Sequence, residues 1–313
     1  MEKAVEILRI KGVATRNKKA DRKASEGILA VNVSADGRAA TLLELNCETD
    51  FVAKNENFIA LAKELVGQAA ANGADGLLEQ PYHADKSRKV NDYLNDQVLK
   101  IGENLKVSRV LKFEATGVGR VSAYVHTGAK IAVLLELGLK TQAAAANPEV
   151  AELARQLAMQ VVANNARFVR REDVSADVVA KEREIAAEFT KSEADKAIDE
   201  AKRIVEDYKG QLVEQKAAND AEAVAELEKR IAVGEKQVIA AEGRKKGQLS
   251  NMEKIISGRV DKFFADSCLL EQAYFRDPEQ KIQALIAAAK GKVGEEVSIV
   301  RFTRFQVGET AAE

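Results

Sequence analysis

Two pairs of short apolar runs, each pair separated by a turn signal, stand out along the chain. The runs and turns cover residues 28–33, 36–37 and 39–47 in the first pair, and residues 121–125, 127–128 and 131–137 in the second. The first turn is Asp36-Gly37, and an Asp-Gly pair between apolar runs is a strong indication of a β-hairpin. We therefore predict two β-hairpins.

Each predicted hairpin is followed by apolar residues at the spacing of one helix face. They are Phe58, Leu61, Leu65 and Ala69 after the first hairpin, and Val150, Leu153, Leu157 and Val161 after the second. Asn147-Pro148 is placed to begin the second helix, because proline is favoured in the first helical turn. We expect each sheet and its helix to share a core.

The two hairpin-helix units are copies of one another. Leu42 to Leu45 recur as Leu134 to Leu137, 92 residues later. The same offset carries a set of helix residues onto their counterparts: Leu61, Ala62, Leu65, Ala71 and Asn72 onto Leu153, Ala154, Leu157, Ala163 and Asn164. A match of this extent indicates an internal duplication.

A third strand is predicted in each copy, and its position locates an insertion. The strand of the first copy covers residues 107–113, and its Val107-Ser108 pattern reappears as Val297-Ser298, an offset of 190 residues. The second copy therefore holds about 98 extra residues. They lie between its helix and its last strand, and that strand is predicted at residues 300–305.

The inserted segment, residues 176–257, is rich in Ala, Glu, Lys and Asp, with spaced apolar residues. This pattern is typical of long helices with narrow apolar seams. Asn219-Asp220 interrupts the pattern, so we predict that two helices fold back on each other as an antiparallel hairpin. Gly234, Gly243 and Gly247 each weaken the return helix by about 1 kcal/mol relative to alanine, and we expect that helix to be bent or broken.

Composition excludes several classes of function. Lys and Arg number 48 against 49 Asp and Glu, so the chain lacks the basic excess that nucleic-acid binding requires. The only cysteines are Cys47 and Cys268 and the only histidines His83 and His126, and no spacing among them is typical of a metal site. We expect no metal, no cofactor and no nucleic-acid partner.

Membrane insertion and covalent catalysis are not expected either. No apolar run reaches the roughly 18 to 20 residues that span a bilayer, and we predict a cytoplasmic protein. The chain has no GxxxxGK[ST] loop, so it is not itself a P-loop GTPase. It also has no cysteine and histidine at a spacing typical of an activated nucleophile, and we predict no catalytic residues and no enzyme activity.

The segment between the first hairpin and its helix, residues 46–58, permits two interpretations. In one, Thr49 or Asp50 caps the helix and Phe51 packs locally. In the other, an acid and an aromatic on a strand-to-helix loop form an interaction tip. The second copy carries Thr141-Gln142-Ala143 at the equivalent place. The fold therefore does not require Asp-Phe there, which favours the interaction tip.

Residues 44–54, Glu-Leu-Asn-Cys-Glu-Thr-Asp-Phe-Val-Ala-Lys, resemble the long diagnostic motif of the elongation factor Ts family. Further similarities occur in the family's order at residues 100–104, 125–131, 172–174, 262–264, 269–272 and 304–309. The resemblance implies an α+β fold with two related subdomains, each with a three-stranded antiparallel sheet and packed helices. It also implies an inserted antiparallel coiled-coil hairpin.

This resemblance and the duplication together imply four parts of the chain. They are a remnant of a ubiquitin-associated-type helical domain with a linker at 1–25, a first core subdomain at 26–116, a second at 117–175 and 258–313, and the helical hairpin at 176–257. Residues 2–8 resemble only the last helix of the family's amino-terminal three-helix domain. This implies either a start codon assigned too late or a shortened domain.

The resemblance implies that the chain binds the GTPase elongation factor Tu and promotes release of its GDP. The contact residues it implies are Thr49, Asp50, Phe51, Val52, Lys54 and Asn55 in the first copy, and His126 and Gly128 in the second. Phe51 is expected to act as a wedge, with Asp50 near the route to the magnesium site of the GTPase. The stoichiometry stays open, with a homodimer or a two-plus-two complex with elongation factor Tu among the alternatives.

The alternative function is that of a structural coiled-coil interaction protein without exchange activity. In that case residues 176–257 would carry the function and the α+β units would be end pieces. Uninterrupted heptads are required for such a role, and the glycines of the return helix disfavour them.

Overall fold

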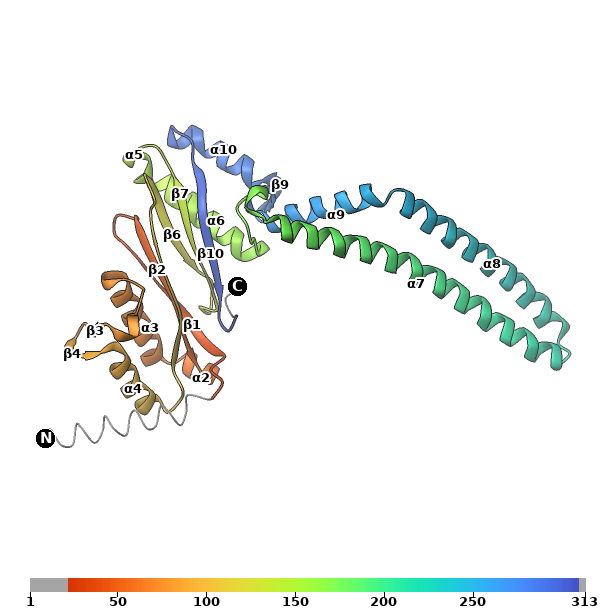
Figure 1. Ribbon diagram of the computed structural model, residues 1–313, viewed down its shortest axis with the longest axis horizontal. Helices are drawn as coiled ribbons and strands as arrows, with labels where there is room; N and C mark the ends of the chain where they lie inside the picture. The colour runs from red at the N-terminus through yellow and green to blue at the C-terminus, as the bar shows by residue number, and fades with distance from the viewer. Residues whose placement is uncertain (1–21, 310–313) are drawn as a thin grey trace. The chain divides into compact units, whose positions relative to one another are not determined.

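The computed structural model describes residues 22–309, and their contacts divide into two compact units (Figure 1). The first unit joins the chain up to Val169 with the chain from Ser267 onwards, and the second is Arg170–Asp266. The α+β fold class is confirmed. Of the predicted helical-domain remnant at 1–25, residues 1–21 lie outside the described residues.

The first copy of the repeat is a three-stranded antiparallel sheet covered by helices. Its sheet has the order β1-β2-β5. The elements are β1 Glu26–Val33, β2 Ala39–Cys47, α2 Asp50–Ala53, α3 Glu56–Asn72, η1 Leu77–Glu79, β3 Pro81–Tyr82, β4 Asp85–Lys89, α4 Val90–Ile101 and β5 Lys106–Glu114. Phe58, Leu61 and Leu65 of α3 are buried against β1 and β2, so the predicted helix face is confirmed.

The second copy repeats this order of elements. Its sheet has the order β10-β7-β6. The elements are β6 Gly119–Val125, β7 Ile131–Gly138, α5 Gln142–Ala145, α6 Pro148–Asn164, η3 Leu269–Glu271, β8 Ala273–Tyr274, β9 Asp277–Lys281, α10 Ile282–Val293 and β10 Ser298–Gln306. Pro148 is the first residue of α6, after the Asn147 cap, as the sequence predicts.

The strand register corrects the predicted offset of the last strand. Val107 pairs with Leu45, and Ile299 pairs with Leu137, so β5 and β10 are related by 192 residues rather than 190. The second copy therefore contains 100 extra residues before its last strand, because 192 minus 92 is 100, and not the predicted 98. A slip of two residues preserves the alternation of side chains in a strand, which is why the match of Val107-Ser108 to Val297-Ser298 was misleading.

The two sheets pack on each other through a shared core and two reciprocal polar contacts. The core residues are Leu29, Ala40, Leu42, Phe113, Val121, Ala132, Leu134 and Phe305. At one side, buried Glu44 accepts a hydrogen bond from Arg109 Nε at 2.7 Å, and the guanidinium of Arg109 stacks on Phe305 of the other copy at 4.0 Å. Gly308 N, also from the other copy, donates to Glu44 at 2.9 Å.

The second polar contact repeats the first with the copies exchanged. Arg301 Nε donates to buried Glu136 at 2.7 Å, and the guanidinium of Arg301 stacks on Phe113 at 4.1 Å. Thr116 N, from the first copy, donates to Glu136 at 2.7 Å. We call these two sets of residues the Glu-Arg brackets; they fix the two copies against each other by pseudo-twofold symmetry.

The second unit is a helical hairpin. It consists of η2 Arg171–Asp173, α7 Ala176–Ala217, α8 Ala221–Ser250 and α9 Met252–Ser267, whose last residue belongs to the first unit. Helices α7 and α8 lie side by side (Figure 1). They turn at Asn219, which has a positive φ of 54°, and at Asp220, which caps α8, as predicted. The unit is longer than the predicted insert at both ends, because it begins at Arg170 and ends within α9 at Asp266.

The seam of the hairpin is narrow and built largely of small residues. Its buried members are Ala186, Thr190, Ala194, Ile198 and Val205 of α7, and Leu227, Gly234 and Ala241 of α8. A Cβ on Gly234 would lie 2.6 Å from Val205 Cγ2, so this glycine allows close packing. The predicted break of the return helix is present, but it lies at Asn251, between α8 and α9, rather than at a glycine.

We predict opposite effects of alanine at two glycines of α8. Gly243→Ala should raise the free energy of unfolding by up to about 1 kcal/mol, because alanine is the better helix former and its Cβ would meet nothing within 4 Å. Gly234→Ala should lower it, because Val205 would have to shift. Urea unfolding followed by circular dichroism compares the two. If Gly234→Ala proved as stable as Gly243→Ala, the packing role of Gly234 would be wrong.

We also predict that Glu136 contributes to acid sensitivity. Burial raises its pKa, but hydrogen bonds from Thr116 and Arg301 outweigh burial, and the folded pKa lies below the ordinary 4.5. Such a carboxylate stabilises the fold above its unfolded pKa, and this contribution is lost as the pH falls through the folded pKa. The melting temperatures of the wild type and Glu136→Gln should therefore differ at pH 7 and converge at acid pH. A constant difference from pH 7 to pH 3 would contradict this.

Candidate functional site

The segment predicted as an interaction tip is a single short helix between β2 and α3. Helix α2, Asp50–Ala53, begins after Thr49, whose hydroxyl accepts a hydrogen bond from Val52 N at 3.4 Å. Asn55 caps the next helix by accepting from Asn57 N at 2.9 Å. Ala53 is buried in the first core and Val52 is half-buried against it. Helix α2 is thus fixed by a cap at its start, by the cap of the helix that follows it, and by the packing of Val52 and Ala53 in the first core.

The outer face of α2 presents Phe51. This residue is 81% exposed, the highest value for any large apolar residue among those the structure describes. Asp50 and Lys54 form an ion pair of 2.8 Å one turn apart. The hydrogen bond from Lys54 lowers the pKa of Asp50, and the charge of Lys130 adds to this effect. Asp50 is therefore a carboxylate at neutral pH, and it lies beside an aromatic side chain that has no packing partner in its own core.

The duplication separates structural from unexplained residues in this segment. In the second copy, Thr141 caps α5 and Asn147 caps α6, so the caps formed by Thr49 and Asn55 are a property of the fold. The second-copy counterparts of Asp50, Phe51 and Lys54 are Gln142, Ala143 and Ala146. These side chains make neither the ion pair nor the exposed aromatic surface.

A carboxylate that the sequence analysis missed fixes the start of α2. Glu103 Oε2 accepts hydrogen bonds from Glu48 N and Thr49 N, both at 3.0 Å, and its Oε1 accepts from Thr49 Oγ1 at 2.6 Å. In the second copy Glu295 makes the same three contacts to Lys140 and Thr141. The offset of 192 residues aligns Glu103 with Glu295, whereas the predicted offset of 190 concealed this match.

Cys47 lies directly beneath this segment. Its side chain is fully buried, and Sγ donates a weak hydrogen bond to Thr49 O at 3.1 Å. Burial, with a contribution from the charge of Glu103, raises the pKa of the Cys47 thiol to about 12. The thiol is therefore protonated and shielded while α2 is in place.

The two other predicted contact residues, His126 and Gly128, lie in the turn between β6 and β7. Gly128 has a φ of 85° and Ala129 a φ of 54°, and Ala129 N donates to His126 O at 2.9 Å. The ring of His126 is exposed, with Nδ1 3.2 Å from Tyr124 Oη. The positive φ at the turn explains a glycine at position 128.

The β6–β7 turn and α2 lie at the same end of the first unit. Leu29 N of β1 donates to Ala129 O at 2.8 Å. Lys130 forms an ion pair of 2.5 Å with Glu26, which pairs with Cys47 across the sheet. The charge of Lys130 also reaches Asp50. The two predicted sets of contact residues, 49–55 and 126–128, are thus presented together, although they come from different copies of the repeat.

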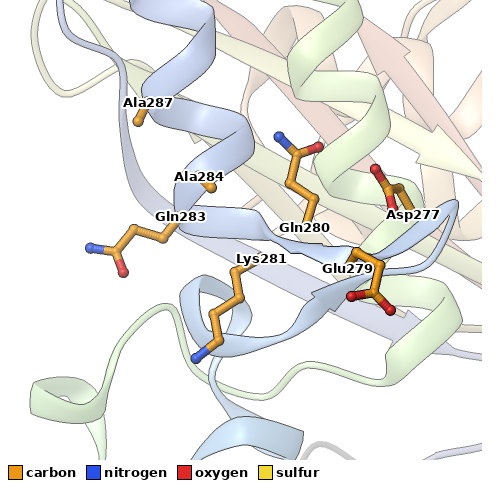
Figure 2. Close-up of a pocket in the computed structure, with 7 residues that line it drawn as sticks. All are labelled: Asp277, Glu279, Gln280, Lys281, Gln283, Ala284 and Ala287. Carbon is orange, nitrogen blue, oxygen red and sulfur yellow. The ribbon is translucent and has the colours of Figure 1, made fainter.

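A surface hollow in the second copy does not resemble a ligand site. It lies between β9 and α10 and is lined by Asp277, Glu279, Gln280, Lys281, Gln283, Ala284 and Ala287. In Figure 2 the polar side chains point in different directions rather than toward one centre. In the first copy, Arg88 and Asp96 form an ion pair of 2.6 Å; their second-copy counterparts, Gln280 and Ala288, cannot form one.

Residues 22–309 contain no group of three or more His, Cys, Asp or Glu side chains that could hold a metal ion. None of the helices in that range is long and apolar enough to cross a membrane.

Comparison with known proteins identifies the family. The family model described as "Elongation factor TS" matches residues 48–309. Proteins named "Elongation factor Ts" from Trichlorobacter lovleyi and from a Nostoc species are each 34% identical to this chain, over 99% of it and 83% of their own length. A third, from Nitratidesulfovibrio vulgaris, is 34% identical over 100% of this chain and 87% of its own. The chain therefore belongs to the elongation factor Ts family of translation elongation factors.

Proposed function

We propose that this chain binds elongation factor Tu and accelerates the release of its bound GDP by inserting Phe51 of α2 into the GTPase. The observation that carries the proposal is the 81% exposure of Phe51 on a helix that is capped and anchored from within. Aromatic side chains that are exposed in the free protein and buried in a complex contribute much of the binding energy of interfaces.

Asp50 gives the wedge a defined charge. A nucleotide in a GTPase is held by backbone amides around its phosphates and by a magnesium ion that bridges phosphate oxygens. A carboxylate brought toward that site perturbs the balance of charge around the metal. In the free protein Asp50 forms an ion pair of 2.8 Å with Lys54. Insertion of α2 would therefore bring both charges into the GTPase together with the phenyl ring of Phe51.

Exchange of this kind requires no covalent step. The factor needs only to bind the nucleotide-free GTPase more tightly than the nucleotide-bound one, and nucleotide then weakens binding of the factor by the same ratio. The chain is in this proposal not an enzyme in the chemical sense, and it does not choose between GTP and GDP. Neither a cofactor nor a catalytic residue is needed.

A second contact belongs to the same proposal. The β6–β7 turn with His126 and Gly128 lies at the same end of the unit as α2, joined to it through β1. Two contacts held at a fixed separation bind one rigid partner more tightly than either alone, because the second contact forms without further loss of translational freedom. We infer that His126 and its turn hold a part of elongation factor Tu other than the one that Phe51 enters.

We predict that Phe51→Ala slows GDP release about tenfold, which corresponds to about 1.4 kcal/mol and lies within the range for one interface aromatic. Stopped-flow fluorescence with labelled GDP on elongation factor Tu measures the rate. Circular dichroism should show an unchanged fold, because Phe51 contributes almost nothing to the core.

Val33→Ala is the matched control, because Val33 is another exposed apolar residue of the first unit, 43% exposed at the end of β1. It should leave the rate of GDP release within about twofold of the wild type. A Phe51→Ala protein that released GDP at the wild-type rate would refute the wedge.

A further inference from the structure

The contacts of Glu103 join two segments that are far apart in the sequence. Glu103 follows Gly102, the αL residue that ends α4, and its carboxylate accepts three hydrogen bonds from Glu48 and Thr49. In return, Glu48 Oε1 accepts from Asn104 N at 2.7 Å. We call these four hydrogen bonds the Glu103 clamp. They tie the residues before α2 to the end of α4 in both directions.

The Glu103 clamp also orients the cap of α2. Because Thr49 Oγ1 donates its only proton to Glu103 at 2.6 Å, its lone pairs are left for Val52 N, at 3.4 Å. The clamp therefore selects the hydroxyl orientation that caps the helix. Helix α2 has only four residues, too few to be stable by itself, so its direction is set by contacts such as these.

The second copy has the same arrangement without an aromatic side chain on its short helix. Glu295 accepts from Lys140 N at 2.6 Å, Thr141 N at 3.1 Å and Thr141 Oγ1 at 3.0 Å. Helix α5, which Thr141 caps, carries Ala143 where α2 carries Phe51. The same hydrogen bonds thus support an exposed aromatic in one copy and a methyl group in the other. The chain contains its own control for a purely structural role.

We propose that Glu103 is a positioning residue for nucleotide exchange: it holds α2 so that Phe51 is aimed before the partner is met. This inference rests on the proposed function, because it concerns the same wedge. A side chain that is pre-oriented loses less conformational freedom on binding. Glu103 itself does not have to touch the partner.

The test compares Glu103→Gln with Glu295→Gln in the full chain. Glutamine keeps the length of the side chain but offers one acceptor oxygen where the carboxylate offers two. Neither variant can therefore accept all three hydrogen bonds that the glutamate accepts from the two residues before its short helix. Both variants should lower the melting temperature by similar amounts. Only Glu103→Gln should slow GDP release at saturating factor, by about threefold to tenfold, the range expected below the full loss of one aromatic contact.

Alkylation of Cys47 gives a readout that does not depend on exchange. Its thiol is buried under Thr49, and burial raises its pKa to about 12, so it reacts with iodoacetamide only when α2 moves away. Glu103→Gln should increase the rate of Cys47 alkylation severalfold, while Glu295→Gln should not. Cys268, buried in the second copy, serves as the internal reference in mass spectrometry of the same sample.

The double variant Phe51→Ala with Glu103→Gln separates positioning from any independent contribution. If Glu103 acts through Phe51, the double variant should release GDP no more slowly than Phe51→Ala alone. A double variant that multiplies the two losses overturns the inference, and so does equal slowing by Glu295→Gln. If Phe51→Ala is slow but Glu103→Gln exchanges at the wild-type rate, the inference fails and the proposed function stands. If Phe51→Ala itself is not slowed, both fail.

Discussion

Two buried carboxylates, Glu44 and Glu136, determine how the copies of the repeat lie against each other. Each is about 1% exposed, and a buried carboxylate that loses its partner costs several kcal/mol. Each is satisfied by an arginine of its own copy and by a backbone N–H of the other, from Gly308 and Thr116. Few placements of the two sheets meet both demands at once. Because this placement is fixed, α2 of one copy and the β6–β7 turn of the other come to the same end of the unit.

The duplication also distinguishes residues of the site that the fold requires from residues that it does not require. The caps at Thr49 and Asn55 and the carboxylate of Glu103 recur in the second copy, so they belong to the scaffold that turns a strand into a helix. Asp50 and Phe51 do not recur. A residue that the scaffold does not need is free to be selected by a partner, and an exposed phenyl ring contributes little to the stability of the free protein. This difference between the copies supports the proposal that Asp50 and Phe51 contact a partner.

Local patterns in the sequence were sufficient for the hairpins, the helices and the turn at Asn219, because each depends on neighbouring residues. They were not sufficient where the structure depends on contacts between distant segments. The last strand was placed two residues out of register, since a shift of two leaves the alternation of a strand unchanged. Helix propensity predicts a weak point of α8 at Gly234, whereas this glycine packs against Val205 and the break lies at Asn251. Glu103 was missed because its donors lie 54 and 55 residues earlier in the chain.

In the proposed mechanism, the entropy cost of ordering a loop favours a wedge that is carried by a helix of one turn. Fixing the backbone of each residue costs about 1 to 2 kcal/mol. Ordering a flexible loop of four residues on binding would therefore cost several kcal/mol, which exceeds the free energy gained by burying one aromatic side chain. In α2 this cost is met during folding, by the cap of Thr49, the buried Ala53 and the contacts of Glu103. In the proposed mechanism, burial of Phe51 in elongation factor Tu is then available to stabilise the nucleotide-free state. A helix too short to be stable alone is thus ordered before binding, because contacts with the surrounding fold fix its position.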